Sequence, residues 1–270
     1  MPYKVLDIYK DLPRTNCGEC GKSGCFAFAT VVYLEGEDPA GCPHIPTSQA
    51  KRIKELVIED RTQGGGKKEP VWDQALAHLQ NKMGEADLAA LAKSSGSLFE
   101  GGEIRLNFLN REHRVRPDSI TVDVGAQPSV WVKIFIYIYL TRANGAPPKG
   151  EWAAFRELPN SVSKSHTFEG CADEIADLFS GRGEALAAAV ERLGGVKVEF
   201  GSAQKSYKLK VLPRVEVLLL FWEKTSEFPA RATILVDKGI LDYLDQEAIV
   251  FMAEALVKEI AGESINEVIP

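Results

Sequence analysis

Four cysteines crowded into one short stretch constrain this chain more than any other feature of its sequence. The spacing is Cys17-x2-Cys20-x4-Cys25-x16-Cys42, and the fifth cysteine, Cys171, stands far away. Four thiolates, three of them in one tight loop, can enclose a single [4Fe-4S] cluster, and a fourth that returns after a helix-length segment completes the ligand set. The pattern therefore predicts a small N-terminal domain built around one [4Fe-4S] cluster held by these four residues.

Glycine and apolar residues surround the four cysteines in the way that an anionic cluster requires. A cluster held by four thiolates carries net negative charge, so backbone N–H groups must approach its sulfur atoms, and glycine allows that approach because it has no Cβ. The neighbouring glycines are Gly18, Gly21, Gly24 and Gly41. We expect four apolar residues to keep water away from the cluster: Phe26, Phe28, Val31 and Val32.

Three other interpretations of the four cysteines remain open from the spacing alone. A structural zinc site usually takes its ligands from two Cys-x2-Cys knuckles, and only one is present here. Two disulfides would need an oxidising compartment. Unliganded thiols usually occur as scattered core residues rather than as a group. His44, two residues after Cys42, either hydrogen-bonds a cluster sulfur or is an ordinary loop histidine.

The charge balance and the apolar runs exclude several classes of protein. The net charge is −6 at pH 7, and neither nucleic-acid phosphates nor anionic membranes attract a surface of that sign. The two most apolar runs, 134–140 and 217–222, fall short of the roughly 18 residues that a bilayer requires. Charged residues interrupt the N-terminal stretch, which argues against a secretory signal. We therefore expect a cytoplasmic protein with reduced thiols, no nucleic-acid partner and no membrane span.

A glycine-rich stretch divides the chain into two expected domains. Residues 62–70 read Thr-Gln-Gly-Gly-Gly-Lys-Lys-Glu-Pro and lack hydrophobic periodicity, which is typical of a flexible linker. The cysteine domain is therefore expected to span 1–61 and to end in a helix that begins near Thr47. The second domain is expected to span 71–270.

The second domain mixes helical and strand patterns without a regular strand–helix–strand rhythm. Apolar spacing predicts a pair of helices or one kinked helix over 72–91, with a weak point at Gly84. It also predicts helices over 175–179 and 186–193, and from Asp245 to Gly262. Alternation predicts antiparallel strands over 104–108 and 120–124 with a turn near Asn110, and strands over 207–211, 215–222 and 233–236. Residues 129–142 are apolar nearly all round, which suits a buried helix, with a strand as the rival. The predicted class is α+β, a small and mostly helical iron–sulfur domain followed by a larger mixed domain with antiparallel sheet and several helices.

The N-terminal motif is similar to a known module. The matching segments are Leu12-Pro13-Arg14-Thr15-Asn16-Cys17-Gly18-Glu19-Cys20-Gly21, Cys25-Phe26-Ala27-Phe28-Ala29 and Cys42-Pro43. They resemble the N-terminal [4Fe-4S] domain of the large subunit of the corrinoid iron–sulfur protein, over about residues 3 to 60. In that family the four cysteines ligate the cluster, which passes an electron to an oxidised cobalt centre. The resemblance implies a redox partner, a corrinoid or methyl-transfer protein, in anaerobic metabolism.

The remainder of the chain departs from that family. It has neither an eightfold strand–helix pattern for a barrel nor the Asp-x-His-x-x-Gly segment that many cobalamin binders use. Residues 70 to 262 instead resemble a family of unknown function that is fused to this cluster domain in anaerobic bacteria and archaea. The segments that carry the resemblance are Gly150-Glu151-Trp152-Ala153-Ala154-Phe155-Arg156-Glu157-Leu158-Pro159, Leu212-Pro213-Arg214, Phe221-Trp222 and Glu227-Phe228-Pro229-Ala230.

One segment of the second domain carries candidate binding residues. Glu151, Trp152 and Arg156 lie between glycine and proline and do not follow a core periodicity. A loop with an aromatic ring, a guanidinium and carboxylates can bind a ligand or a partner. The alternative is an internal Arg–Glu pair that holds the loop in place.

These patterns favour an iron–sulfur protein for electron transfer or for reductive activation of a partner metal centre, a task that needs no catalytic side chain. A redox enzyme with its site in residues 71–262 and a zinc-stabilised adaptor are the alternatives, and cluster delivery or redox sensing would keep the same four ligands. Basic residues around the cysteines predict a docking face for an acidic redox partner, although a charge-balanced surface would also contain them. They are Lys10, Arg14, Lys22, Lys51 and Arg52.

Overall fold

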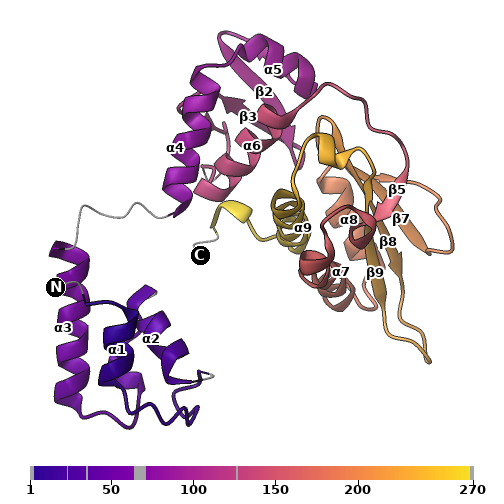
Figure 1. The fold of residues 1–270 in the computed structure, drawn as a ribbon. Coiled ribbons are helices and arrows are strands. Elements are labelled where there is room, and N and C mark those ends of the chain that lie inside the picture. The colour runs from indigo at the N-terminus through magenta and orange to yellow at the C-terminus, as the bar shows by residue number, and fades with distance from the viewer. Residues whose placement is uncertain (1–2, 23, 35, 64–70, 126, 268–270) are drawn as a thin grey trace. The chain divides into compact units, whose positions relative to one another are not determined.

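The chain forms two compact units, Met1–Pro70 and Val71–Pro270 (Figure 1). The computed structural model describes residues 3–22, 24–34, 36–63, 71–125 and 127–267. The predicted linker 62–70 lies mostly outside these residues, but its first two residues belong to the helix α3 (Thr47–Gln63). The helix passes the expected boundary because no helix-breaking residue occurs before Gly64.

The first unit is a small helical domain, as predicted. It consists of α1 (Val5–Asp11), α2 (Cys25–Leu34), the 3-10 turn η1 (Pro39–Gly41) and α3. One apolar cluster holds these elements together, and its buried members are Ile8, Leu12, Cys25, Phe28, Ala29, Val32, Cys42, Ile53 and Val57. Two of the four motif cysteines, Cys25 and Cys42, therefore belong to the core of this unit.

The second unit opens with two helices, α4 (Val71–Gly84) and α5 (Leu88–Ser95), so the first of the two arrangements that the sequence allowed is the one present. Asp87 begins α5, because its carboxylate accepts hydrogen bonds from the N–H groups of Ala89 and Ala90 at 2.9 and 3.2 Å. Gly96 ends it in the left-handed conformation, with φ of 70°. The break that the sequence places at Gly84 thus separates two distinct helices.

The first sheet is an antiparallel meander in chain order: β1 (Leu98–Glu100), β2 (Glu103–Phe108), β3 (Arg111–Val115) and β4 (Ile120–Thr121). The expected turn is present, with Leu109 and Asn110 at φ of 48° and 61°. The next strand, however, is β3 rather than residues 120–124. Its sequence Arg-Glu-His-Arg-Val conceals the alternation, because one of the two inward residues is the buried His113.

Residues 130–142 form the helix α6 (Val130–Arg142), so the helical interpretation of this apolar segment is confirmed. Ser129 caps it, since its hydroxyl accepts a hydrogen bond from the N–H of Val132 at 3.4 Å. The helix is apolar nearly all round because most of its circumference is buried. The buried residues are Val132, Phe135, Ile136, Tyr137, Tyr139 and Leu140.

The second sheet is antiparallel with the order β5-β9-β8-β7-β6. Its strands are β5 (Trp152–Ala154), β9 (Arg231–Asp237), β8 (Val215–Trp222), β7 (Lys205–Leu212) and β6 (Val196–Lys197). The short turns η2 (Phe155–Glu157), η3 (Val162–Lys164), η4 (Ile240–Asp242) and η5 (Ile265–Glu267) connect the elements of this half. Helices and antiparallel sheets together confirm the α+β class.

Three helices complete the second unit: α7 (Ser165–Leu178), α8 (Gly183–Arg192) and α9 (Gln246–Ala261). Helix α7 contacts β9, α8 contacts β7, and α9 packs against α6, α7 and α8 (Figure 1). As predicted, α9 begins at the cap Asp245, whose carboxylate accepts from the N–H of Ala248 at 3.0 Å, and ends at Gly262, with φ of 87°. Among the described residues, no helix has both the length and the apolar character needed to cross a bilayer.

Candidate metal centre

The segment that carries the first three cysteines is closed by a hydrogen bond from one end to the other. The N–H of Cys25 donates to Oδ1 of Asn16 at 2.9 Å, so the residue before Cys17 is tied to the first residue of α2. Gly24 is required beside this bond, because a Cβ at that position would lie 2.9 Å from the same Oδ1 atom. Gly18 and Gly21 adopt φ of 76° and 78°, a region that glycine enters without strain.

The fourth cysteine approaches the start of α2 from the other side. Asp38 caps η1, since its Oδ1 accepts from the N–H of Ala40 at 3.0 Å. Gly41 lies so close to Phe28 that a Cβ there would be 3.6 Å from the ring. Cys42 follows directly and joins the same apolar cluster as Cys25 and Phe28. The residue before Cys42 thus packs against Phe28, about one turn after the start of α2.

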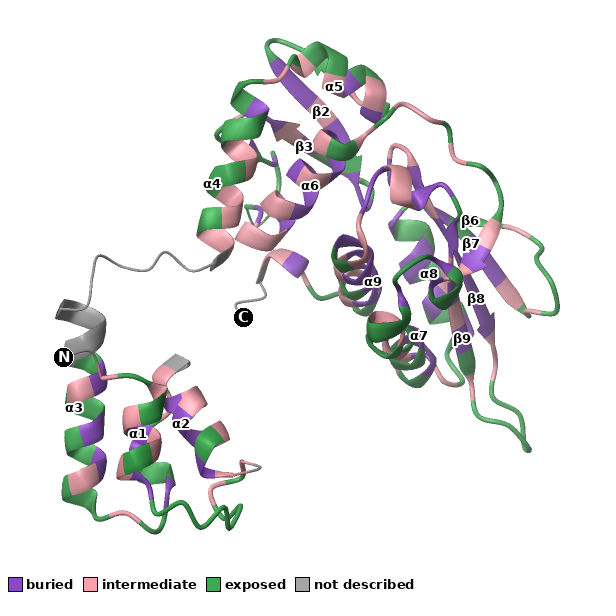
Figure 2. Ribbon diagram, in the orientation of Figure 1, coloured by how far each residue is buried: buried purple, intermediate pink, exposed green. Residues whose placement is uncertain are grey.

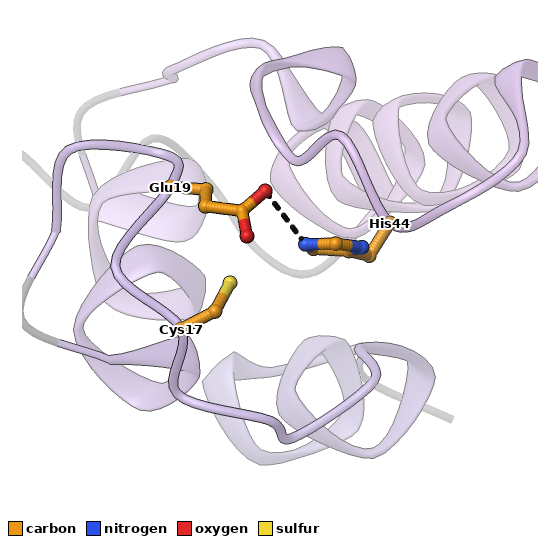
Figure 3. A group of neighbouring side chains, drawn as sticks. All are labelled: Cys17, Glu19 and His44. Carbon is orange, nitrogen blue, oxygen red and sulfur yellow. Dashed lines mark hydrogen bonds and ion pairs between the residues drawn. The ribbon is translucent and has the colours of Figure 1, made fainter.

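Glu19 and His44 join the two cysteine segments (Figure 3). Nε2 of His44 lies 2.9 Å from Oε2 of Glu19, and the sulfur of Cys17 lies with both side chains in a group whose ligand atoms are within 4.8 Å of one another. Each of the two partners stands two residues after a cysteine, Cys17 or Cys42. Their contact therefore joins the segment that carries Cys17 to the segment that carries Cys42, and in the described part of the chain Cys17 is the one motif cysteine in this group.

The four thiols differ in their exposure to solvent. Cys25 and Cys42 are buried, Cys20 is partly buried, and Cys17 is exposed. All four are free thiols, as is Cys171. The apolar cluster thus covers Cys25 and Cys42, whereas Cys17 lies at the surface.

The donor set fits a metal group with negative charge. Thiolate sulfur is the ligand that iron–sulfur clusters and structural zinc share. Cys25 is the first residue of α2, so its side chain lies at the end of the helix that attracts a negatively charged ligand. Burial instead raises the pKa of Cys171 to about 12, which keeps that remote thiol protonated and unreactive.

The structure does not gather the second set of predicted site residues into one pocket. Glu151 pairs with Lys238, with Oε2 and Nζ 3.1 Å apart, and Trp152 lies in the edge strand β5. Nη1 of Arg156 lies 3.7 Å from Oε1 of Glu169 on α7. A cavity of about 230 Å³ is lined by Arg156 but by neither of the other two residues. Arg156 thus forms an ion pair with an acidic residue, as the alternative interpretation of this segment supposed, although the partner lies on α7.

The backbone next to Glu151 is held by a buried carboxylate. Asp237 is 2% exposed and accepts hydrogen bonds from the N–H groups of Lys149 at 3.0 Å, Gly150 at 2.6 Å and Gly239 at 2.7 Å. Three N–H donors satisfy the charge of a carboxylate that water cannot reach. Asp237 is therefore the residue that orders this loop.

Most of the basic residues expected to form a docking face have carboxylate partners. The distances are 3.0 Å for Lys10 to Asp7, 2.9 Å for Lys22 to Glu37, 3.9 Å for Lys51 to Glu55 and 3.8 Å for Arg52 to Asp11. The charge of these four residues is therefore balanced locally by carboxylates of the described part of the unit.

Sequence reasoning singled out His44 but overlooked its partner Glu19. The only signal was a shared spacing, since each stands two residues after a cysteine. Glutamate and histidine at such positions are common in loops, so the spacing becomes informative only when the two loops are seen to meet (Figure 3).

Comparison with known proteins identifies both halves of the chain. Residues 12–44 match the family model described as “Putative Fe-S cluster”, and residues 87–259 match the “Domain of unknown function (DUF3786)”. These matches confirm the expectation of an iron–sulfur domain followed by a domain of unknown function. No solved structure matches the chain.

The similar curated proteins match only the cysteine unit. The gamma subunit of the acetyl-CoA decarbonylase/synthase complex of Methanocaldococcus jannaschii is 41% identical over 61 residues, which are 22% of this chain and 12% of that protein. The gamma 2 subunit of Methanosarcina thermophila is 43% identical over 53 residues, 19% of this chain and 11% of that protein. The gamma subunit of Methanopyrus kandleri is 33% identical over 68 residues, 24% and 15% of the two chains.

The chain thus spans a small fraction, 11% to 15%, of the length of these relatives. The domain model, in contrast, covers residues 87–259, which is more than half of the chain. The chain therefore belongs to the family of the domain of unknown function DUF3786, and it carries at its N-terminus a segment of the iron–sulfur cluster family.

Proposed function

We propose that Cys17, Cys20, Cys25 and Cys42 hold one [4Fe-4S] cluster and that the chain is an electron-transfer protein of the reducing cytoplasm. The observation that carries this proposal is the contact between the two cysteine segments, made by the Glu19–His44 pair beside Cys17. The match of residues 12–44 to an iron–sulfur family supports it.

The residues of the first unit support such a role without a catalytic side chain. When bound, the cluster supplies a one-electron couple. Phe28 and Val32, both buried, exclude water from the side of Cys25 and Cys42. The exposed Cys17 segment provides the short path along which an electron reaches a partner at the surface.

The partner that we propose is a protein with a corrinoid or another metal centre of methyl transfer. The N-terminal unit resembles the cluster domain of the corrinoid iron–sulfur protein, and the relatives that match it are named as subunits of the acetyl-CoA decarbonylase/synthase complex. Because the match ends with the cysteine unit, the second unit would provide the recognition that is particular to this chain.

The test is to purify the full chain without oxygen and to measure iron, zinc, acid-labile sulfide and the electron paramagnetic resonance spectrum after reduction. We expect about four iron and four sulfide per chain and a signal from one reducible cluster. Cys17→Ser, Cys20→Ser, Cys25→Ser and Cys42→Ser should each lower the iron content.

Cys171→Ser is the matched control, because its thiol is buried in the other unit, and it should leave the iron content unchanged. Zinc without sulfide would refute the cluster and leave the adaptor interpretation. Iron that is insensitive to the four substitutions would refute the assigned ligands.

A further inference from the structure

The second unit contains a cavity of about 460 Å³ between α6, the start of α7 and α9. We call it the α6–α9 cavity. Its apolar lining consists of Trp131, Ile134, Phe135, Ile138, Ala248, Val250, Phe251 and Ile265, and its polar lining of Lys164, Thr167, Glu247, Glu254 and Lys258. This size and this excess of apolar lining are typical of small-molecule sites.

The apolar walls of the cavity are rigid and incompletely covered. Trp131 and Phe251 remain partly exposed although they lie on helices that are otherwise mostly buried. Trp131 packs against Trp72 of α4 with ring centroids 5.4 Å apart, and Phe251 packs against Phe135 at 5.2 Å. These ring contacts fix the two aromatic walls before any ligand arrives.

The cavity extends along the direction of α9. Lys164 of η3 pairs with Glu247 in the first turn of α9, with Nζ and Oε1 2.5 Å apart. Ile265, from the turn η5 that follows α9, lines the cavity as well. Residues from both ends of the helix therefore line the space, which follows α9 over most of its length.

Of the two lysines that line the cavity, one can bind an anionic ligand. Glu254 and Lys258 stand one turn apart on α9, and the charge of Lys258 acts on the Glu254 carboxyl, although within the described part of the chain neither residue forms an ion pair within 4.0 Å. Partial desolvation raises the pKa of the Glu254 carboxyl, and the nearby charge of Lys258 opposes that rise. Lys164 is already neutralised by Glu247. The ammonium of Lys258, which forms no ion pair within 4.0 Å among the described residues, is thus the group that an incoming anion would meet.

We propose that the α6–α9 cavity binds a small molecule with an apolar ring or chain and one anionic group. The apolar part lies between Trp131, Ile138 and Phe251, and the anionic group binds Lys258. This site lies wholly within the second unit, so it is independent of the proposed cluster.

The test uses two fluorescent probes on the full chain: anilinonaphthalene sulfonate, an aromatic anion, and phenylnaphthylamine, its neutral counterpart. We expect saturable binding of one probe per chain in the micromolar range. Lys258→Glu should weaken binding of the sulfonate at least tenfold and leave the neutral probe unchanged. Lys82→Glu is the matched control, because it makes the same charge change at an exposed position of α4, and it should change neither affinity.

A second variant distinguishes binding inside the cavity from binding at its charged rim. Ile138→Trp fills the apolar space without adding charge and should weaken both probes at least tenfold. Val162→Trp adds a similar bulk at a residue that is 82% exposed and outside the lining, and it should weaken neither. Energy transfer from tryptophan to the bound probe should fall in Trp131→Phe and persist in Trp222→Phe.

Three results would overturn the proposal. They are equal affinities in the wild type, Ile138→Trp and Lys258→Glu proteins; uptake of many probes without saturation; or binding of amphipathic helical peptides in place of both probes. The last result would assign the cavity to a protein partner.

Discussion

Oε2 of Glu19 lies 2.9 Å from Nε2 of His44, although 25 positions of sequence separate the two residues. The pair connects the segment of Cys17 to that of Cys42 (Figure 3). Both side chains are largely exposed, so we expect the pair to stabilise the closed arrangement of the two segments by less than about 1 kcal/mol.

Glu19→Gln removes the charge of this pair and keeps the shape of the side chain. If the cluster is present, iron should pass to a chelator about two- to fivefold faster than in the wild type, as expected for a weak exposed pair. Glu55→Gln breaks the exposed Lys51–Glu55 pair of the same unit, away from the cysteines, and should leave the rate unchanged. Equal rates in all three proteins would show that the pair does not hold the segments together.

Gly24→Ala should weaken retention of iron because the new Cβ would displace the Asn16 side chain. That side chain accepts the hydrogen bond from Cys25, and a lost hydrogen bond of this kind costs about 1 kcal/mol. Gly41→Ala is the matched control, because its Cβ would meet Phe28 at an ordinary distance of 3.6 Å. We expect a lower iron content in Gly24→Ala than in Gly41→Ala after the same anaerobic purification, and the reverse order would contradict this account.

Tyr139→Phe should destabilise the second unit by about 1–3 kcal/mol. The hydroxyl of Tyr139 donates to the carbonyl of Ser95 at 2.5 Å and accepts from the N–H of Arg214 at 3.0 Å, and the side chain is fully buried. Without the hydroxyl, both backbone groups lose their partner. Urea unfolding followed by tryptophan fluorescence measures the effect, because all four tryptophans lie in this unit.

Tyr207→Phe is the control for that substitution. Tyr207 is equally buried, at 2% exposure, and its hydroxyl donates to no other described residue. The loss in unfolding free energy should therefore be much smaller than for Tyr139→Phe, and equal losses would refute the role of the two hydrogen bonds.

His113 should make the second unit less stable in mild acid. The imidazole is 2% exposed, its Nδ1 donates to the carbonyl of Arg111 at 2.9 Å, and burial lowers its pKa to about 4. The ordinary pKa of histidine is 6.5, and the unfolded chain has this value. Between pH 6.5 and pH 4, His113 is therefore protonated in the unfolded chain and neutral in the folded protein. The free energy of unfolding should thus fall with pH by about 1.4 kcal/mol per unit in this window.

The measurement compares the wild type with His113→Gln by urea unfolding at pH 7 and pH 5. Carboxylates titrate in both proteins, so the contribution of His113 is the difference between the two pH dependences. The wild type should lose about 2 kcal/mol more than the variant. Equal pH dependences in the two proteins would show that His113 is protonated in the folded protein as readily as in the unfolded chain.

The ends of helices could be predicted from the sequence because helix capping depends on residues that are close together in the chain. Asp245 and Gly262 mark α9, and the weak point at Gly84 marks the break between α4 and α5. Residues 129–142 were ambiguous because a helix buried on most of its circumference loses the polar stripe that distinguishes it from a strand. Strand β3 was missed because its core-facing histidine reads as polar.

The candidate metal centre was predictable in one respect only. The spacing of the cysteines indicates a common site because three of them fall within one loop, and their role as ligands stays a prediction. The Glu19–His44 contact depends on how two loops fold onto each other. The α6–α9 cavity lies between helices that are more than 100 residues apart in the chain, so no local sequence pattern predicts it.

The position of α9 affects how the protein is made. This helix contacts α6, α7 and α8 and contributes buried residues throughout its length (Figure 2). During synthesis at 5–20 residues per second, roughly 10–40 s pass between the emergence of Cys42 and that of α9. Throughout that interval the nascent chain presents the apolar surface that α9 later covers, while the segment bearing all four motif thiols has already left the ribosome.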